Sequence, residues 1–184
     1  MPRLIAFLRA INVGGHTVKM DALRRHFAEL GLKGVETFIA SGNVIFSSGA
    51  ADLGALERRI ERRLHEELGF EVATFLRTEA EVGAVARYLP FPAERMRAAG
   101  SLNVGFLAEA LGPAERSAVM GLATDIDHFH LSGREVYWMC ARRQSESTMS
   151  NAVFEKALKR RVTFRGLRTV ERLAARLGAA GAEA

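Results

Sequence analysis

The chain has 184 residues, 48% of them hydrophobic, and its 26 basic and 21 acidic side chains give a net charge of +5. This length and composition predict one globular domain or two small ones, and the arginine-rich excess suits recognition of phosphate or carboxylate groups. A single cysteine, Cys140, excludes a disulfide framework, and no apolar run is long enough to span a membrane, so we expect a cytoplasmic protein without a membrane partner.

The first 78 residues show the pattern βαββαβ. Apolar side chains recur at helical spacing in two segments, and short apolar runs bounded by Gly and polar residues indicate strands. The predicted strands are residues 4–8, 35–39, 44–46 and 72–76, and the predicted helices are residues 20–30 and 53–68. Residues 40–43 join two of these strands as a hairpin.

The second half begins with a helix and repeats part of this pattern. The segment from Thr78 to Glu81 has the form of a capping box, and the helix it starts is broken near Pro90 and Pro92. A linker follows to about Gly100. The predicted strands are residues 102–107, 126–131 and 136–140, and helices are predicted after Pro113, around residues 153–158 and around residues 170–177.

These elements predict an α+β fold of two ferredoxin-like plaits, a βαββαβ unit over residues 1–78 and a βαββα-type unit with a C-terminal helix over residues 79–184. No residue-level repeat is evident between the halves. Strands 4–8, 44–46 and 136–140 are apolar on both faces, so we expect both faces of each sheet to be covered, by the other plait or by a partner chain. Both a monomer and a homodimer fit this pattern.

The loop between the first strand and the first helix is a candidate anion site. Backbone N–H groups at a helix start favour an anion, and paired glycines let the backbone approach a ligand closely. The candidate residues are Arg9, Asn12, Gly14, Gly15, His16 and Lys19. The alternative is a tight turn in which a glycine takes a positive φ and Asn12 bonds backbone groups. The loop lacks the glycine pattern of a P-loop or a Rossmann fingerprint.

Two further loops carry groups suited to phosphate oxygens. Ser41 and Asn43 lie in the first hairpin, where a structural turn is the alternative. A basic, hydroxyl-rich segment precedes the helix around residues 153–158, and its alternative is a surface loop with Ser150 as N-cap. Its candidate ligand-binding residues are Arg142, Arg143, Ser147, Ser150 and Asn151.

No metal site and no cofactor are predicted. His128 and His130 share one face of a strand, but no third ligand lies near them in the sequence. Cys140 ends an apolar strand and is expected to be a buried, inert thiol rather than a nucleophile.

Four separated blocks carry a resemblance to a known family. They are Leu8 to Gly15 with Val18-Lys19-Met20, Ser41-Gly42-Asn43-Val44 with Phe46, Gly133 to Tyr137, and Ser147 to Asn151 with Phe154-Glu155-Lys156. Together these blocks resemble the DUF1697 family, which implies a small two-plait α/β protein without an established activity. The chain departs from the family at Ala10, where glycine is usual. It departs again at residues 163–170, which keep Arg165 and Thr169 but lack the Asn-Trp pair that many members carry between them.

The leading prediction is binding of a phosphorylated small molecule between the Gly14-Gly15 loop and the Arg142 to Asn151 loop. Nucleic-acid binding is one alternative, which requires Phe7 and Phe46 to stand on an open sheet face. An acylphosphatase-like hydrolase is the other, with Arg9 and Asn43 as its phosphate-binding pair, although Arg9 precedes its loop whereas the acylphosphatase arginine ends it.

Overall fold

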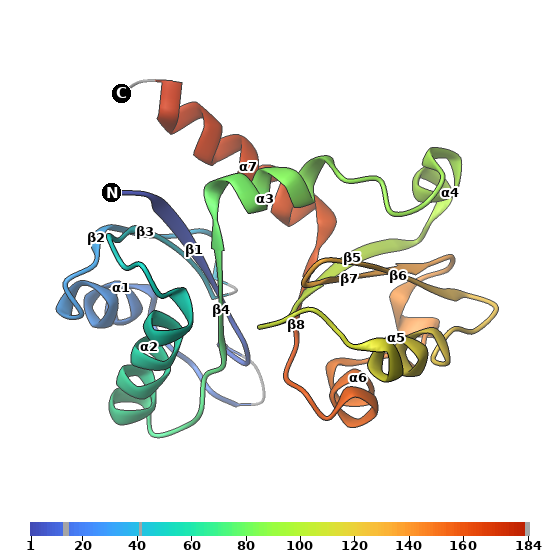
Figure 1. Cartoon of the computed structure of the whole chain (residues 1–184), viewed down its shortest axis with the longest axis horizontal. Coiled ribbons are helices and arrows are strands. Elements are labelled where there is room, and N and C mark those ends of the chain that lie inside the picture. Colours follow the sequence, from blue (N-terminus) through green and yellow to red (C-terminus); the bar gives the residue numbers. More distant parts are fainter. Residues whose placement is uncertain (13–14, 41, 183–184) are drawn as a thin grey trace. The chain divides into compact units, whose positions relative to one another are not determined.

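The computed structural model describes residues 1–12, 15–40 and 42–182, the last four of these by their backbone alone (Figure 1). The chain divides into two compact units, Met1–Gly83 and Ala84–Ala184. Each unit contains one four-stranded antiparallel sheet. No helix in the described ranges combines the length and the apolar composition that a membrane crossing requires.

The first sheet has the order β2-β3-β1-β4, so each of the two helical crossovers joins strands that have one other strand between them. Its elements are β1 (Arg3–Leu8), α1 (Met20–Glu29), β2 (Lys33–Thr37), β3 (Asn43–Ser47), α2 (Leu53–Leu68) and β4 (Thr74–Thr78). Helices α1 and α2 cover the same face of this sheet (Figure 1). This is the ferredoxin-like plait that the βαββαβ pattern predicts.

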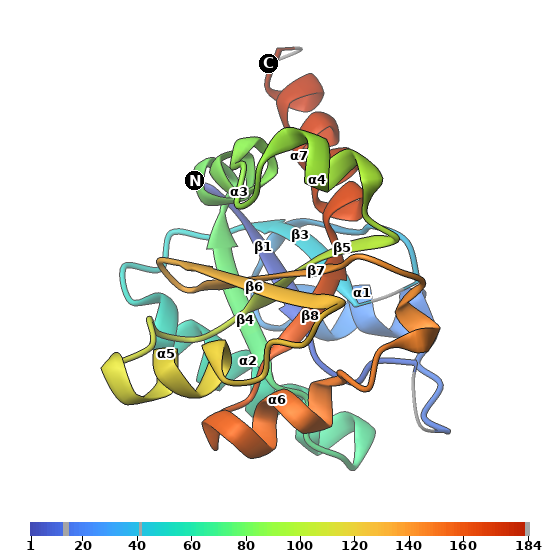
Figure 2. The same ribbon diagram turned by 90° about the vertical axis from the view of Figure 1, so that its right-hand side faces the viewer.

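The second sheet repeats that topology with the order β6-β7-β5-β8. After α3 (Glu79–Arg87), which crosses the boundary between the units, the elements are α4 (Ala93–Ala98), β5 (Ser101–Phe106), α5 (Pro113–Met120), β6 (Asp127–Ser132), β7 (Glu135–Cys140), α6 (Asn151–Leu158), β8 (Thr163–Gly166) and α7 (Leu167–Ala182). Helices α5 and α6 lie on one face of this sheet, and α7 leaves β8 on the other (Figures 1 and 2).

The predicted fold class is confirmed, with two additions in the second half. The short helix α4 lies in the segment that the sequence indicates only as a linker. Strand β8 follows α6 and completes a full βαββαβ unit, whereas the sequence indicates only βαββα there. The second half is therefore a complete plait followed by one extra helix.

The strand registers reveal a correspondence between the two plaits that the sequence alone does not show. Ile5 pairs with Ile45 and Arg77, and Val104 occupies the same place between Tyr137 and Arg165. Aligning the plaits on these positions matches Ile5-Ala6-Phe7-Leu8 with Val104-Gly105-Phe106-Leu107 and Arg77 with Arg165. Both arginines also donate from Nη1 to the carbonyl of the preceding residue, at 2.8 Å and 2.9 Å respectively. The central strand and the β4/β8 edge therefore repeat at the level of single residues.

Each plait has its own hydrophobic core between its sheet and its helices. The first core contains Leu4, Leu23, Phe27, Phe46, Ile60 and Leu76 among others, and the second contains Val119, Phe129, Val136, Trp138, Phe154 and Val162. Ile5 and Phe7, on the sheet face away from the first core, are also 0% exposed. The strands that are apolar on both faces are thus buried on both faces.

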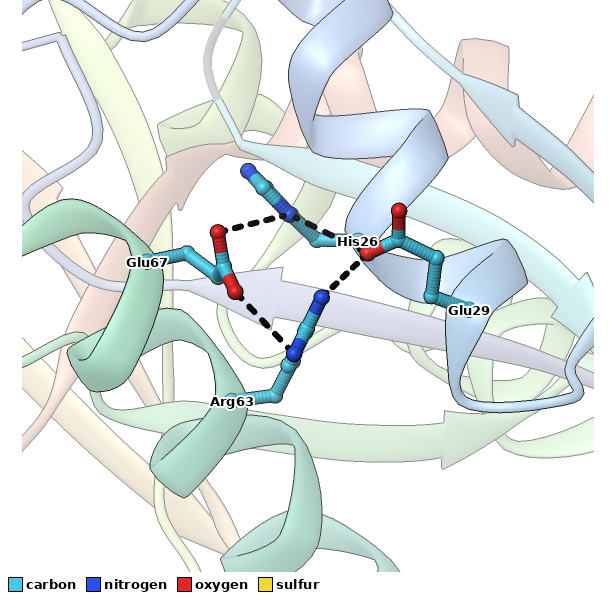
Figure 3. A network of polar contacts seen from close by, with 4 residues as sticks. All are labelled: His26, Glu29, Arg63 and Glu67. Carbon is cyan, nitrogen blue, oxygen red and sulfur yellow. Dashed lines mark hydrogen bonds and ion pairs between the residues drawn. The ribbon is translucent and has the colours of Figure 1, made fainter.

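A polar network joins α1 to α2 on the surface of the first unit (Figure 3). Arg63 of α2 forms an ion pair with Glu29 of α1 and lies 3.0 Å from Glu67. His26 Nδ1 lies 3.7 Å from Glu29 and 4.0 Å from Glu67. The hydrogen bond from Arg63 holds the pKa of Glu29 below its usual range.

Candidate functional site

The first predicted loop uses Asn12 to hold its own backbone. The side-chain oxygen of Asn12 accepts a hydrogen bond from Val18 N–H at 2.6 Å, and its amide donates to the Ala40 carbonyl at 3.2 Å. Asn12 has a φ of +57° and Gly15 has a φ of +88°, both in the left-handed region. These contacts match the turn alternative for Asn12. Gly14 and Ser41 lie outside the described residues.

The other predicted residues of the first unit have mixed roles. The His16 ring stacks on Phe70 with centroids 3.9 Å apart. Lys19 is exposed at the start of α1, and the backbone N–H of Arg9 donates to the Ala73 carbonyl at 2.8 Å. Asn43 is 0% exposed, and its amide donates to the Phe38 carbonyl at 3.1 Å, an arrangement that offers no open amide to an acylphosphatase-like substrate.

The hydroxyl and amide groups of the second predicted loop build the loop itself. Ser150 caps α6 by accepting a hydrogen bond from Val153 N–H at 3.3 Å. Ser147 accepts from Met149 N–H at 2.9 Å, and Asn151 donates to the Val162 carbonyl at 2.9 Å. Arg142 and Arg143 are exposed. Arg142 reaches Glu146 at 3.9 Å, and the Arg143 N–H donates to the same carboxylate at 3.1 Å.

Asp127, which sequence reasoning did not select, anchors this loop to the second sheet. Its carboxylate is 1% exposed and accepts hydrogen bonds from Trp138 Nε1 at 2.8 Å, Ser147 Oγ at 2.8 Å and Thr124 Oγ1 at 3.0 Å. The Ser147 hydroxyl therefore donates its hydrogen to a buried carboxylate. The sequence signal was an acidic residue two positions before Phe129 in a predicted strand, which places Asp127 on the same face as that apolar side chain.

The metal and thiol candidates also have structural partners. His130 Nε2 lies 2.8 Å from the Tyr88 hydroxyl, and its ring lies among Tyr88, Phe91 and Tyr137. In the ranges that the structure describes, no three His, Cys, Asp or Glu side chains gather as a metal site would require. Burial raises the pKa of the Cys140 thiol, which opposes formation of a reactive thiolate.

A cavity of about 700 Å³ lies within the second unit, where β5 begins and β8 runs into α7. Three separate segments of the chain form its wall. The lining residues are Met96, Arg97, Ala99, Gly100, Ser101, Leu102, Asn103, Gln144, Gly166, Leu167, Arg168 and Glu171. Its size falls in the range of small-molecule pockets.

Three charged side chains and one amide oxygen of this cavity have no hydrogen-bond or ion-pair partner in the described part of the chain. Arg97, Arg168 and Glu171 are exposed and form no ion pair or hydrogen bond there. Asn103 is only 9% exposed, and its amide nitrogen donates to Ser101 Oγ at 3.4 Å. Its side-chain oxygen accepts no hydrogen bond from any described residue.

The start of α7 differs from the equivalent helix start in the first plait. Helix α3 follows Arg77 through a capping box, in which Thr78 N–H donates to Glu81 at 2.7 Å and Glu81 N–H donates to Thr78 Oγ1 at 3.2 Å. Helix α7 follows Arg165, and the positions equivalent to Thr78 and Glu81 are Gly166 and Thr169.

As a result, α7 has no internal cap. No side chain among residues 1–12, 15–40 and 42–178 accepts a hydrogen bond from the N–H groups of Leu167, Arg168 or Thr169. A carboxylate of the protein occupies the helix start in the first plait, and in the second plait Gly166 and Leu167 open onto the cavity instead. A helix start of this kind favours an anion.

The cavity adjoins the second predicted loop. A Cβ on Gly100, which lines the cavity, would lie 1.9 Å from the Arg142 carbonyl oxygen, so only glycine lets the two backbones meet there. Gln144 of the same loop is part of the cavity wall. The structure thus brings the beginning of the Arg142 to Asn151 segment to the cavity, while the first predicted loop belongs to the other unit.

Two complete plaits joined in tandem, with an extra helix after the second, define an α+β protein of the two-plait class. The chain belongs to the DUF1697 family, described as a protein family of unknown function, whose family model matches residues 1–137. This confirms the resemblance that the sequence blocks indicate. No curated protein matches the chain.

The fold is similar to that of a solved structure, the conserved bacterial protein SP0830 from Streptococcus pneumoniae. The two chains share 25% sequence identity with a TM-score of 0.76, and the match covers 97% of this chain and 99% of the other. The family-model match ends at residue 137, before Gln144 and α7. The Gly166-Leu167-Arg168 segment, where the sequence departs from the resemblance, forms part of the cavity wall.

Proposed function

We propose that the protein binds a phosphorylated small molecule and that the phosphate group lies in the second-unit cavity at the start of α7. The single observation that carries this proposal is the uncapped helix start, which opens onto the cavity with Arg97 and Arg168 in its wall. The equivalent helix start in the first plait is closed by the Glu81 carboxylate. An external anion would take the place of that carboxylate in the second plait.

The chemistry of the cavity favours phosphate over a neutral ligand. Helix N–H groups and arginine side chains form charge-assisted hydrogen bonds with phosphate oxygens, and the guanidinium fork can bond two oxygens at once. Arg97 and Arg168 come from different elements, α4 and α7, so they can approach one phosphate from two directions. Binding of this kind requires no metal ion.

A titration of the full-length protein with inorganic phosphate tests the proposal. Binding is measured by the changes in the amide NMR chemical shifts of residues 166–169. Arg168→Gln is expected to weaken phosphate binding about 10-fold or more, because it removes a charge-assisted contact. Arg116→Gln is the matched control, since Arg116 is exposed on α5 and lies outside the cavity wall. Equal binding by both variants, or no shift in the wild type, would refute the proposal.

A second variant tests the helix start without removing an arginine. The double substitution Gly166→Thr with Thr169→Glu copies the capping box of α3 onto α7. A Cβ at Gly166 has nothing nearer than Thr169 Oγ1 at 4.0 Å, so the added side chain has room. We expect this variant to be at least as stable as the wild type, because a cap stabilises a helix by about 1 kcal/mol, and to lose phosphate binding.

We propose that the first predicted loop, which belongs to the other unit, is a separate anion site. Gly15, His16 and Lys19 are exposed beside the start of α1 and support this wider proposal. Lys19→Gln in the same phosphate titration tests this site, because it is expected to weaken binding at the loop and to leave binding at the cavity unchanged. We also infer a cytoplasmic location, which the single buried cysteine supports.

A further inference from the structure

We infer that the ligand of the second-unit cavity is the monophosphate of a sugar or a similar polyol; this inference rests on the proposed function and specifies its ligand class. The cavity offers more than a phosphate site. Beyond the two arginines, its wall contains the Glu171 carboxylate, the Asn103 and Gln144 amides and the Ser101 hydroxyl. These groups fit a ligand body that carries hydroxyls.

Glu171 sets the charge that the ligand body can carry. It lies three residues after Arg168 on α7, so the two side chains project from the same helix face with Cβ atoms about 5 to 6 Å apart. A phosphate at the helix start therefore places the rest of the ligand near the Glu171 carboxylate. That carboxylate accepts hydrogen bonds from hydroxyls and repels a second phosphate or carboxylate group.

Asn103 is the observation independent of the helix start that indicates a ligand. Asn103 is one of the residues that line the cavity and is 9% exposed, yet its side-chain oxygen accepts no hydrogen bond from the described residues. The Asn103 oxygen is not fully enclosed, so a donor from outside the protein can reach it. A nearly buried amide oxygen is stabilised when a donor reaches it, and a ligand hydroxyl supplies that donor.

Gly166 explains why there is space in front of Asn103. The two residues are direct partners across β5 and β8, so their side chains would lie on the same face of the sheet. Because Gly166 has no side chain, the neighbouring position on β8 does not cover the Asn103 amide. Any larger residue at position 166 would extend toward this part of the cavity.

The nonpolar part of the wall favours a sugar over a nucleotide. Its apolar side chains are those of Met96, Ala99, Leu102 and Leu167, and none of the residues that line the cavity is aromatic. A nucleobase is usually held by stacking on an aromatic ring, which this wall does not provide. The carbon skeleton of a sugar needs only aliphatic contacts together with hydrogen-bond partners for its hydroxyls.

Isothermal titration of the full-length protein at fixed ionic strength tests the inference with four probes: inorganic phosphate, ribose 5-phosphate, fructose 1,6-bisphosphate and adenosine 5′-monophosphate. Ribose 5-phosphate is expected to bind at least 10-fold more tightly than inorganic phosphate and more tightly than the other two organic probes. Glu171→Gln is expected to reduce the preference for ribose 5-phosphate over the bisphosphate about 10-fold. Glu94→Gln, an exposed change on α4 outside the cavity wall, is the control and should leave that preference unchanged.

The outcomes separate the two proposals. The phosphate site stands if inorganic phosphate binds the wild type and Arg168→Gln abolishes that binding. The ligand class is nevertheless wrong if ribose 5-phosphate binds no more tightly than inorganic phosphate. It is also wrong if Glu171→Gln leaves the preference for ribose 5-phosphate over the bisphosphate unchanged. Tighter binding of the mononucleotide than of ribose 5-phosphate also overturns the ligand class. If none of the probes binds the wild type, the proposed function itself fails.

Discussion

At the scale of single residues, the buried Asp127 carboxylate holds the second loop in place through three donors. Asp127→Ala leaves Trp138 Nε1 and the hydroxyls of Ser147 and Thr124 without their acceptor. We expect the substitution to lower the free energy of unfolding by about 3 kcal/mol, because unsatisfied buried donors cost about 1 to 3 kcal/mol each and the two hydroxyls can turn to water. Urea unfolding measured by circular dichroism gives this value.

Asp125→Ala is the matched control for that change. Asp125 lies two residues earlier, is exposed, and its side chain forms no hydrogen bond or ion pair with the described residues. Its removal should alter the free energy of unfolding by less than about 0.5 kcal/mol. Equal effects of the two substitutions would show that the Asp127 hydrogen bonds add no net stability. Fluorescence of Trp138, the only tryptophan, reports separately on whether the indole environment changes.

Glu29 makes a contribution to stability that depends on pH. Because Arg63 lowers the pKa of Glu29 in the folded protein below 4.5, the unfolded state takes up this proton first as the pH falls. The stabilisation is complete above pH 4.5 and is lost as the pH falls through the folded pKa. The network with His26, Arg63 and Glu67 is thus expected to weaken in acid (Figure 3).

Glu29→Gln removes this titration and keeps the side-chain size. Its free energy of unfolding, measured from pH 7 down to pH 3, should fall less steeply than that of the wild type on the acid side of 4.5. Glu94→Gln, at an exposed position of α4, should follow the wild-type curve. Parallel curves for the wild type and Glu29→Gln would mean that the Arg63 contact does not persist in solution.

At the scale of elements, glycine-to-alanine substitutions in β5 and α7 should have opposite effects. A Cβ on Gly105 of β5 would lie 2.8 Å from the Phe164 ring and 2.9 Å from Val162, so alanine overpacks the second core. A Cβ on Gly178 of α7 meets nothing within 4 Å. We expect Gly105→Ala to destabilise by about 1 to 3 kcal/mol and Gly178→Ala to stabilise by about 0.5 to 1 kcal/mol.

Thermal unfolding of the two variants beside the wild type checks this pair. A neutral Gly105→Ala would show that Phe164 can move away without loss, which would remove the packing reason for glycine at that position. A destabilising Gly178→Ala would contradict the open surroundings of that part of α7. Because both variants carry the same chemical change, differences in the unfolded state largely cancel between them.

Most elements could be predicted from the sequence because their local signals agree with the tertiary structure. The predicted helix over 53–68 matches α2, with Asp52 as its N-cap and Gly69 in the left-handed conformation at its end. The capping box that starts α3 forms as its sequence predicts. Strand β8 was missed because it has only four residues, Thr163–Gly166, and Arg165 interrupts its apolar pattern.

At the scale of the whole molecule, the cavity could not be predicted because its wall comes from segments distant in the sequence. Residues 96–103, Gln144 and residues 166–171 are brought together by the β5–β8 pairing and by the contact of Gly100 with the Arg142 backbone. The beginning of the predicted second loop lies at the cavity. The side chains of Ser147, Ser150 and Asn151, further along the loop, form hydrogen bonds with backbone groups. Hydroxyl-rich composition alone does not distinguish a ligand contact from a cap.

The whole chain carries a net charge of +5, which attracts the phosphate groups of nucleic acids. Phe7 and Phe46, which RNA recognition on an open sheet would require, are both 0% exposed. Any binding of RNA is therefore expected to come from dispersed basic side chains alone, without stacking. Such binding weakens steeply with salt, because each phosphate contact releases condensed counterions.

Fluorescence anisotropy distinguishes binding by dispersed charge from specific recognition, with a labelled single-stranded RNA measured between low salt and 200 mM salt. We expect whatever binding occurs at low salt to be lost by 200 mM and to be nearly the same for the wild type and Arg168→Gln, since one arginine is a small part of a dispersed charge. Inorganic phosphate binding should show the reverse dependence, with strong loss in Arg168→Gln. A different result would be RNA binding that persists at 200 mM salt and disappears in Arg168→Gln. RNA and inorganic phosphate would then both depend on Arg168, which would mean that the start of α7 binds a phosphate of the nucleic acid.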